Sequence, residues 1–211
     1  YINTIEHIDA EVGRLLKTLD ELKLADNTYV IYTTDNGPWL QFRHHGGSAG
    51  PLREGKGTTF EGGQRVPCVM RGPGIPAGSV CDELTGTIDL LPTIAALTGK
   101  PLPSKNKIDG VDASGLWKGT AKKSPRKEFL HYTSRGDIEG IRSGNWKLLV
   151  KKPRRNNAGK AQLHLFDLAK DVGEKNNLAE AKPAVVKELQ ARMKELDAEI
   201  TKNARSPWFK N

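Results

Sequence analysis

The chain has 211 residues, of which 36% are hydrophobic, and a formal net charge of +8 at pH 7. This length allows one large domain or two small ones, and no stretch approaches the ~20 apolar residues that a membrane-spanning helix requires. The positive charge would suit a polyanion such as a sulfated polysaccharide, a nucleic acid or an anionic surface. No nucleic-acid-binding motif and no interleaving of aromatic and basic residues accompanies this charge, so we do not expect a nucleic-acid partner. The lack of a long apolar stretch means that we do not expect a membrane span either.

The first hundred residues alternate between helical and extended patterns, which favours an α/β layer. The spacing of apolar residues predicts a helix at 4–24, a buried strand at 28–34, a strand at 66–71 and a helix at 88–98 that Gly99 ends. Residues 37–64 form a long glycine-rich loop between the two strands. A loop of this length in a compact domain is usually functional.

Extended segments dominate the second half of the chain. We expect strands at 128–132, 140–142, 146–150 and 162–167, and a final helix at 182–203. Neighbouring strands of this kind usually form antiparallel hairpins, and the apolar stripe of the helix can cover one face of their sheet. A stretch rich in proline, glycine and lysine separates the two halves, so we expect two parts, residues 1–115 and 116–211. Two basic runs, residues 122–127 and 151–157, are typical of solvated connectors between strands.

An acidic residue and an amide, Asp35 and Asn36, follow the first predicted strand directly. Neighbouring residues inside a strand point to opposite faces, so the two side chains can share one ion only if the backbone turns. Gly37 and Pro38 supply that turn. Oxygen ligands of this kind suit a hard cation such as Ca²⁺. The alternative is a turn whose side chains bond only to their own backbone.

About twenty residues later, Lys56 stands between two glycines, Gly55 and Gly57, inside the glycine-rich loop. Glycines let the backbone approach a bound group closely, and a lysine there can meet an anion. A solvated lysine is the alternative. A cation site and an anion site this near in sequence suggest the hydrolysis of an ester.

These motifs together resemble a known family. Residues 34–38 (Thr-Asp-Asn-Gly-Pro) and 55–63 (Gly-Lys-Gly-Thr-Thr-Phe-Glu-Gly-Gly) are similar to the C-terminal half of a formylglycine-dependent sulfatase of the arylsulfatase type, in the alkaline-phosphatase-like superfamily. The resemblance covers most of the chain. It continues through residues 65–67, 88–93, 165–168 and 174–179.

The resemblance implies both a fold and an activity. The implied fold is α/β, the C-terminal part of an alkaline-phosphatase-like sulfatase core followed by a small antiparallel β-sheet subdomain with a C-terminal helix. The implied enzyme is a Ca²⁺-dependent sulfuric ester hydrolase that acts on a sulfated carbohydrate or an aryl sulfate, with Mg²⁺ a less suitable ion. Asp35 and Asn36 would be metal ligands. Lys56 would be both a catalytic and a substrate-binding residue, because a positive charge can offset negative charge on the transferring sulfuryl group.

The nucleophile of the family is a formylglycine made from a cysteine in a Cys-x-Pro-x-Arg motif. Neither Cys68 nor Cys81 has Pro two positions later and Arg four positions later. Ca²⁺ also takes about 6–8 oxygen ligands, more than Asp35 and Asn36 can supply. We therefore expect the formylglycine and the missing ligands to come from the remainder of the sulfatase chain, upstream of Tyr1, and we expect this fragment alone to be inactive. The two cysteines leave open one disulfide bridge or two free thiols.

Further residues near these motifs are weaker candidates. His45 and Arg53 are expected to bind substrate, with a surface histidine as the alternative for His45 and the mouth of the pocket as the place for Arg53. Glu61 is expected to be structural, and Arg65 to make a structural ion pair. Trp39 could stack on a sugar or aryl ring, or belong to a hydrophobic wall.

Two rival functions remain open at this stage. A phosphodiesterase or phosphonate monoester hydrolase of the same superfamily would use the same metal corner on a different ester. A non-catalytic module would hold sulfated glycan through its basic loops. The resemblance also implies a periplasmic or extracellular location, since sulfatases of this type are commonly exported.

Overall fold

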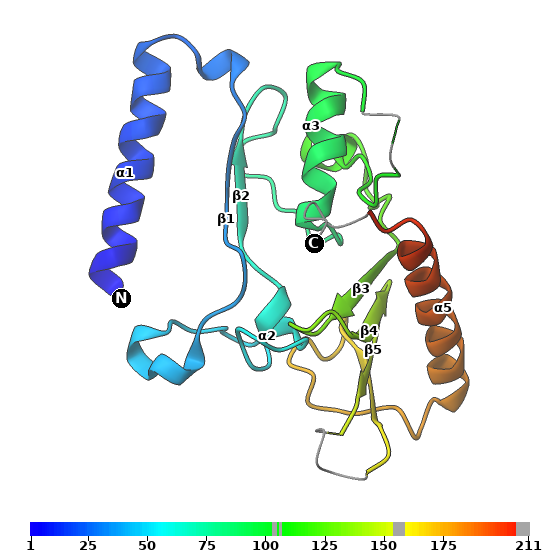
Figure 1. Ribbon diagram of the computed structural model, residues 1–211. Helices are drawn as coiled ribbons and strands as arrows, with labels where there is room; N and C mark the ends of the chain where they lie inside the picture. The colour runs from blue at the N-terminus through cyan, green and yellow to red at the C-terminus, as the bar shows by residue number, and fades with distance from the viewer. Residues whose placement is uncertain (103–104, 106, 154–158, 206–211) are drawn as a thin grey trace, which may run out of the picture.

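The computed structural model describes residues 1–102, 105, 107–153 and 159–205 of the chain. Figure 1 shows a first part in which helix α1 lies beside a two-stranded sheet, and a second part in which helix α5 lies against a four-stranded sheet. Part of the second basic run, residues 154–157, lies outside the described residues. None of the described helices combines the length and the apolar character that crossing a bilayer requires.

The first part confirms the predicted order of helices and strands. It contains α1 (Ile2–Glu21), β1 (Val30–Thr33), α2 (Glu61–Gln64), β2 (Cys68–Arg71), α3 (Leu90–Thr98) and α4 (Ser114–Trp117). Strands β1 and β2 pair in antiparallel fashion, with Thr33 opposite Cys68. Gly99 ends α3 with a left-handed backbone (φ 65°), a conformation that glycine adopts without a steric penalty.

The prediction that the first strand is buried was wrong. No residue of β1 is fully buried, and Tyr32 is 41% exposed. Helix α1 also buries none of its residues, and Ile2 is 70% exposed. Within the described chain, β1 pairs only with β2. Several apolar residues of α1 and Tyr32 of β1 are therefore exposed, whereas Ile31 on the other side of β1 packs against the buried cluster of Ala113, Leu116 and Trp117.

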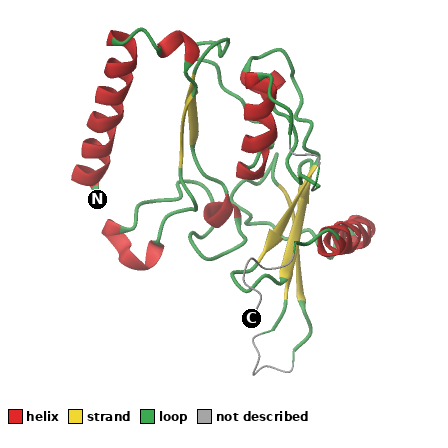
Figure 2. Cartoon of the chain, turned by 45° about the horizontal axis from the view of Figure 1, so that its top comes forward, coloured by secondary structure: helices red, strands yellow, loops and turns green. Residues whose placement is uncertain are grey.

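The second part is a four-stranded antiparallel sheet in simple sequential order. Its strands are β3 (Glu128–Tyr132), β4 (Ile138–Ser143), β5 (Trp146–Lys151) and β6 (Gln162–Asp167), and α5 (Pro183–Lys202) follows them. One face of the sheet packs on α5, as the turned view in Figure 2 shows. The core at this face joins a cross-strand row with an apolar stripe of the helix, and it comprises Ile141, Leu148, Leu165, Val186, Leu189 and Met193.

The other face of the sheet is covered by the glycine-rich loop. Successive residues of a strand point to opposite faces, so Leu149 lies opposite to Leu148. On this second face Leu149 packs with Phe166, with Leu168 and with Phe60 from the loop. The sheet thus lies between a helix and the loop that carries the predicted anion-binding lysine.

A buried ion pair links α3 to the segment that leads into the sheet. The carboxylate of Asp89 accepts hydrogen bonds from the guanidinium of Arg126, at 2.7 Å from Nε and 2.5 Å from Nη2. Both side chains are almost fully buried. Arg126 belongs to the first basic run, residues 122–127, which was expected to be solvated, so that expectation was wrong at this position. The two residues are 37 positions apart in sequence, so no local pattern predicts that they pair.

Candidate active site

The predicted metal corner lies at the end of β1. The hydroxyl of Thr34 donates to Oδ1 of Asp35 at 3.3 Å and to the carbonyl of Asn36 at 3.5 Å. Asp35 is exposed and Asn36 is half-buried. The chain turns here away from the sheet, so a carboxylate and an amide stand next to each other outside the strand.

The glycine-rich loop lies directly against this corner. The backbone N–H of Lys56 donates to the carbonyl of Pro38 at 2.9 Å, and that of Gly37 donates to the carbonyl of Gly63 at 3.2 Å. A Cβ atom on Gly37 would lie 1.7 Å from the carbonyl oxygen of Gly62, so the contact requires glycine. Two motifs that are about twenty residues apart in sequence are therefore neighbours in the fold.

The side chain of Lys56 is exposed at this place. Its ammonium nitrogen lies 5.2 Å from the centroid of the Trp39 ring, within the range of a cation–π contact. Trp39 is itself 48% exposed and packs edge-on against Phe42. Among the residues that the structure describes, Lys56 makes no ion pair with a carboxylate. Its charge is thus available to an anion that enters from solvent.

The other candidate substrate contacts differ in how they are held. His45 is exposed at the end of the 3₁₀ segment η2 (Leu40–His45). Arg53 is half-buried; its Nη1 donates to the carbonyl of Glu174 at 2.8 Å, and its guanidinium lies 4.0 Å from the centroid of the Phe60 ring. Arg53 therefore supports the base of the loop through these contacts.

The structure agrees with the role predicted for Glu61 and disagrees with the role predicted for Arg65. Glu61 is buried, as a structural residue should be, and Lys147 donates to it at 2.9 Å. Arg65 was expected to make a structural ion pair, but it is exposed and has none with any described carboxylate. It follows the last residue of α2 and lines a cavity instead.

A cavity of about 370 Å³ extends from the metal corner toward the four-stranded sheet. Its lining includes Asp35, Cys68, Cys81, His131 and Arg142. Both cysteines are free thiols in the structure, so the bridge that the sequence left open is not formed. Partial burial raises the pKa of the Cys68 thiol.

His131 of β3 is buried beside this cavity, and neither of its ring nitrogens has a hydrogen-bond partner among the described residues. Burial holds the pKa of His131 well below its usual value, and the positive charges of Lys147, Arg142 and Lys151 lower it further. The imidazole is therefore neutral at physiological pH. Sequence reasoning identified the strand but not the unpaired state of this side chain.

The donor atoms at the corner fit part of a hard-cation site. Asp35 and Asn36 offer side-chain oxygens, which suit Ca²⁺ better than the nitrogen and sulfur ligands preferred by zinc. Within the described ranges, no three His, Cys, Asp or Glu side chains gather in a way that could hold a metal. The corner can supply two of the ligands, and a complete shell would need others.

The chain is similar to known proteins both in sequence and in fold. The profile of the family described as "Sulfatase" matches residues 1–100, and that of "N-sulphoglucosamine sulphohydrolase, C-terminal" matches residues 55–200. Arylsulfatase A from Homo sapiens is 39% identical over 225 aligned positions, which cover 94% of this chain and 44% of that protein.

Solved structures agree with the sequence comparison. The PsFucS1 sulfatase from a Pseudoalteromonas species superimposes with a TM-score of 0.79 at 28% identity, over 95% of this chain and 43% of that one. The protein BT4656, solved in complex with its substrate D-glucosamine-2-N,6-O-disulfate, gives a TM-score of 0.73 at 26% identity, over 96% of this chain and 40% of that one. These likenesses confirm the expected α/β fold. The chain spans less than half the length of these relatives, and it belongs to the sulfatase family of the alkaline-phosphatase-like superfamily.

Proposed function

We propose that the protein to which this chain belongs is a sulfuric ester hydrolase that releases sulfate from a sulfated carbohydrate or an aryl ester. The observation that carries the proposal is the contact between the two motifs, in which the Lys56 backbone donates to Pro38 beside the Asp35–Asn36 corner. This contact brings the backbone of Lys56, whose side chain is exposed, against the turn that follows Asp35 and Asn36. A sulfate ester needs positive charge on both sides as negative charge develops on its oxygens. Membership of the sulfatase family supports the same reaction.

Each residue of the site has a role in this proposal. Asp35 and Asn36 bind Ca²⁺, which when bound supplies the charge that polarises a sulfate ester. Mg²⁺ is less suitable, because it demands near-ideal octahedral geometry. Lys56 binds the sulfate oxygens and offsets negative charge on the sulfuryl group and the departing oxygen. His45 and Arg53 contact the rest of the substrate, with Arg53 limited to the donors that Glu174 does not occupy.

The remainder of the parent chain completes the site in this proposal. It supplies the formylglycine nucleophile and the missing metal ligands, and it packs on the apolar side chains that α1 and β1 leave exposed. The uncovered residues support this role, since a stable surface rarely leaves such a stripe in solvent. They include Ile2, Ile5, Leu15 and Tyr32. We also propose a periplasmic or extracellular location, which the family resemblance favours.

The test uses the full-length parent protein, matured with formylglycine and calcium. It is assayed for sulfate release from an aryl sulfate and from a sulfated glucosamine, alongside a phosphate diester and a phosphonate monoester. We expect sulfate release, and we expect Lys56→Ala to lower kcat by roughly 10²–10³-fold, as loss of a group that stabilises transition-state charge does. Lys187→Ala, an exposed lysine of α5, is the matched control and should leave kcat unchanged. Turnover of the phosphorus esters alone would establish the first rival, and binding of sulfated glycan without turnover would establish the second.

The metal role has its own measurement. Asp35→Ala in the parent should lower the calcium retained after dialysis and lower kcat with it. Asp26→Ala removes an exposed carboxylate from the 3₁₀ segment η1 (Ala25–Asn27), away from the corner, and should change neither. Equal calcium content in the two variants would remove Asp35 from the proposed ligand set.

A further inference from the structure

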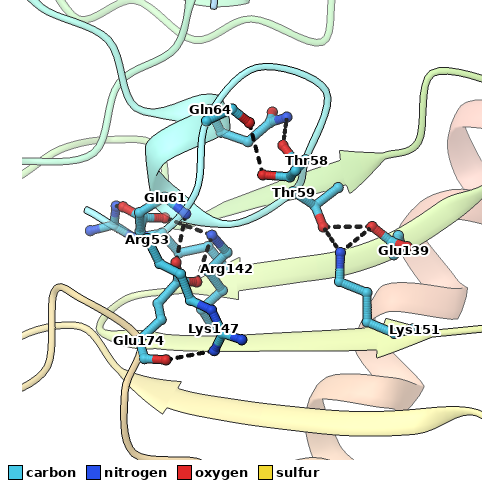
Figure 3. Close-up of polar contacts among 11 residues, drawn as sticks. Arg53, Thr58, Thr59, Glu61, Gln64, Glu139, Arg142, Lys147, Lys151 and Glu174 are labelled. Atoms are coloured by element: carbon cyan, nitrogen blue, oxygen red, sulfur yellow. Dashed lines mark hydrogen bonds and ion pairs between the residues drawn. The ribbon is translucent and has the colours of Figure 1, made fainter. Parts of the chain in front are cut away.

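A lysine of the sheet, Lys147 on β5, is completely buried between two glutamates. Its ammonium nitrogen lies 2.9 Å from Oε1 of Glu61 and 3.0 Å from Oε1 of Glu174. All three side chains are almost fully shielded from solvent. Figure 3 shows that they meet between the glycine-rich loop and the strands, with Arg142 of β4 nearby, 3.7 Å from Oε2 of Glu61.

Glu174 also binds both ends of the loop segment that carries Lys56. Its Oε2 accepts a hydrogen bond from the backbone N–H of Glu61 at 2.6 Å, and its carbonyl accepts one from Arg53 at 2.8 Å. The backbone N–H of Gly62 donates to the carbonyl of Arg53 at 2.8 Å and closes the segment at its base. Residues 53–61 therefore form a closed loop whose two ends are fixed to one residue of the second half of the chain.

Removal of Lys147 would disturb this arrangement strongly. Two buried carboxylates would then lie close together, and Arg142, 3.7 Å from Oε2 of Glu61, would be the remaining ion-pair partner of Glu61 among the described residues. A buried charge that loses its partner destabilises its surroundings strongly, because the carboxylate is left without solvent or counter-ion. Burial already raises the pKa of Glu174, although Lys147 acts in the opposite direction. The loop is the element that can move to relieve this repulsion.

The apolar contact between loop and sheet does a different job from the charged one. Phe60 packs with Leu149 and Phe166, and such contacts attract without fixing a direction. The hydrogen bond that Lys147 donates to Oε1 of Glu61 is directional and short, at 2.9 Å, so it fixes where the loop sits on the sheet. That position in turn determines where the Lys56 backbone meets Pro38.

We propose that Lys147, Glu61 and Glu174 are positioning residues, which hold the Lys56 loop against the Asp35–Asn36 corner from the four-stranded sheet. The proposal rests on the proposed sulfatase function for its effect on catalysis. In this arrangement the sheet of the second half of the chain is part of the active-site support, and Lys147 acts through Lys56 without touching substrate.

The test is a double-mutant cycle in the parent enzyme. Lys147→Met should lower kcat by about 10–100-fold, the size of effect that a displacement of about 1 Å produces. In a Lys56→Ala background, Lys147→Met should lower kcat by no more than about 2-fold, because the group through which Lys147 acts is already gone. Arg126→Met removes another buried ion pair, whose arginine donates to Asp89, Glu128 and Asp109 and to no residue of the loop, and it should leave the kcat of the folded enzyme unchanged. An undiminished kcat in Lys147→Met, or an equal penalty in the two backgrounds, would overturn the proposal.

A second readout separates positioning from activity. Hydrogen exchange at the amides of Lys56, Gly62 and Gly63 should be faster in Lys147→Met than in Arg126→Met. Unchanged exchange would overturn the proposal, whereas faster exchange in a parent that releases no sulfate would retain the positioning role and refute the proposed function. If Lys147→Met does not fold, Glu174→Gln replaces it in both experiments, since its amide oxygen can still accept from the Glu61 backbone.

Discussion

The change Asp89→Asn tests the link between the two halves of the chain. Oδ1 of Asp89 accepts from the Val111 backbone at 2.8 Å and from Nη2 of Arg126 at 2.5 Å. Oδ2 accepts from the Gly86 backbone at 2.8 Å and from Nε of Arg126 at 2.7 Å. Asparagine would replace one of these oxygens with an NH₂ group. The backbone N–H and the Arg126 N–H that donate to that oxygen would then face another donor. It would also leave the buried guanidinium of Arg126 without its carboxylate partner, with only the carbonyls of Glu128 and Asp109 to accept from it.

The expected cost follows from the burial of both partners. The side chains of Asp89 and Arg126 are 2% and 9% exposed. Removing one partner of a buried ion pair costs about 3–5 kcal/mol, out of a total stability of roughly 5–15 kcal/mol for a typical protein. The control is Glu21→Gln in α1, which removes an exposed pair with Lys17 and should cost about 0.5 kcal/mol or less.

The pH dependence of this effect has a definite sign. Burial alone would raise the pKa of Asp89, but Arg126 and the two backbone donors outweigh it and lower the pKa. The folded-state pKa therefore lies below the unfolded value of about 3.9. The stabilisation by Asp89 is complete above about pH 4 and is lost as the pH falls through the folded-state pKa. The difference between the wild type and Asp89→Asn should shrink in that acidic range.

Urea unfolding of the parent protein at constant m-value measures both the free-energy cost of Asp89→Asn and the change of that cost with pH. We expect a large drop in the midpoint at pH 7 for Asp89→Asn and almost none for Glu21→Gln. A cost below about 1 kcal/mol at pH 7 would refute the reasoning about the buried pair. A cost that does not change between neutral and strongly acidic pH would refute the reasoning about its charge.

Two further predictions concern the cavity and the metal corner. Because the pKa of His131 is held well below its usual 6.5, the unfolded chain binds more protons than the folded chain, and stability falls as the pH drops below about 6.5. His131→Phe should remove that loss of stability. The prediction would be contradicted if the unfolding midpoint of His131→Phe changed between pH 7 and pH 5 as much as that of the wild type. Gly37→Ala places a Cβ against the Gly62 carbonyl and should abolish folding or separate the corner from the Lys56 loop, as parent activity and hydrogen exchange at Lys56 would show. Its control, Gly13→Ala in open space on α1, should stabilise by about 0.5–1 kcal/mol.

Local sequence patterns predicted the elements of this fold well, because alternation and helical spacing depend only on near neighbours. Strand β3 occupies residues 128–132 as expected, and α5 lies within the predicted 182–203. The burial of β1 was not predictable in the same way. An apolar run indicates that a strand can be buried, but the covering element decides whether it is.

The candidate site was predictable only in part, for a related reason. The contact of the Lys56 backbone with Pro38 was not predictable, since no local rule brings together two loops about twenty residues apart. Lys147 and Glu61 are 86 residues apart, so their pairing leaves no periodic trace in the sequence. Lys147 in particular has two strongly apolar neighbours, and its partners Glu61 and Glu174 explain a charge on that face of the strand.

The division of the chain into residues 1–115 and 116–211 stays a proposal, and the contacts indicate how such parts would be joined. Phe60 and Glu61 belong to the first segment by sequence, yet they bury themselves against Leu149 and Lys147 of the second. Without the loop, the sheet would expose an apolar face, and Lys147 would lose its pairing with Glu61, which would be costly. The two segments therefore share one interface. Its apolar contacts hold the loop on the sheet, and its ion pairs fix the position of the loop there. Because Lys56 lies within the shared loop, the stability of this interface and the geometry of the site depend on the same residues.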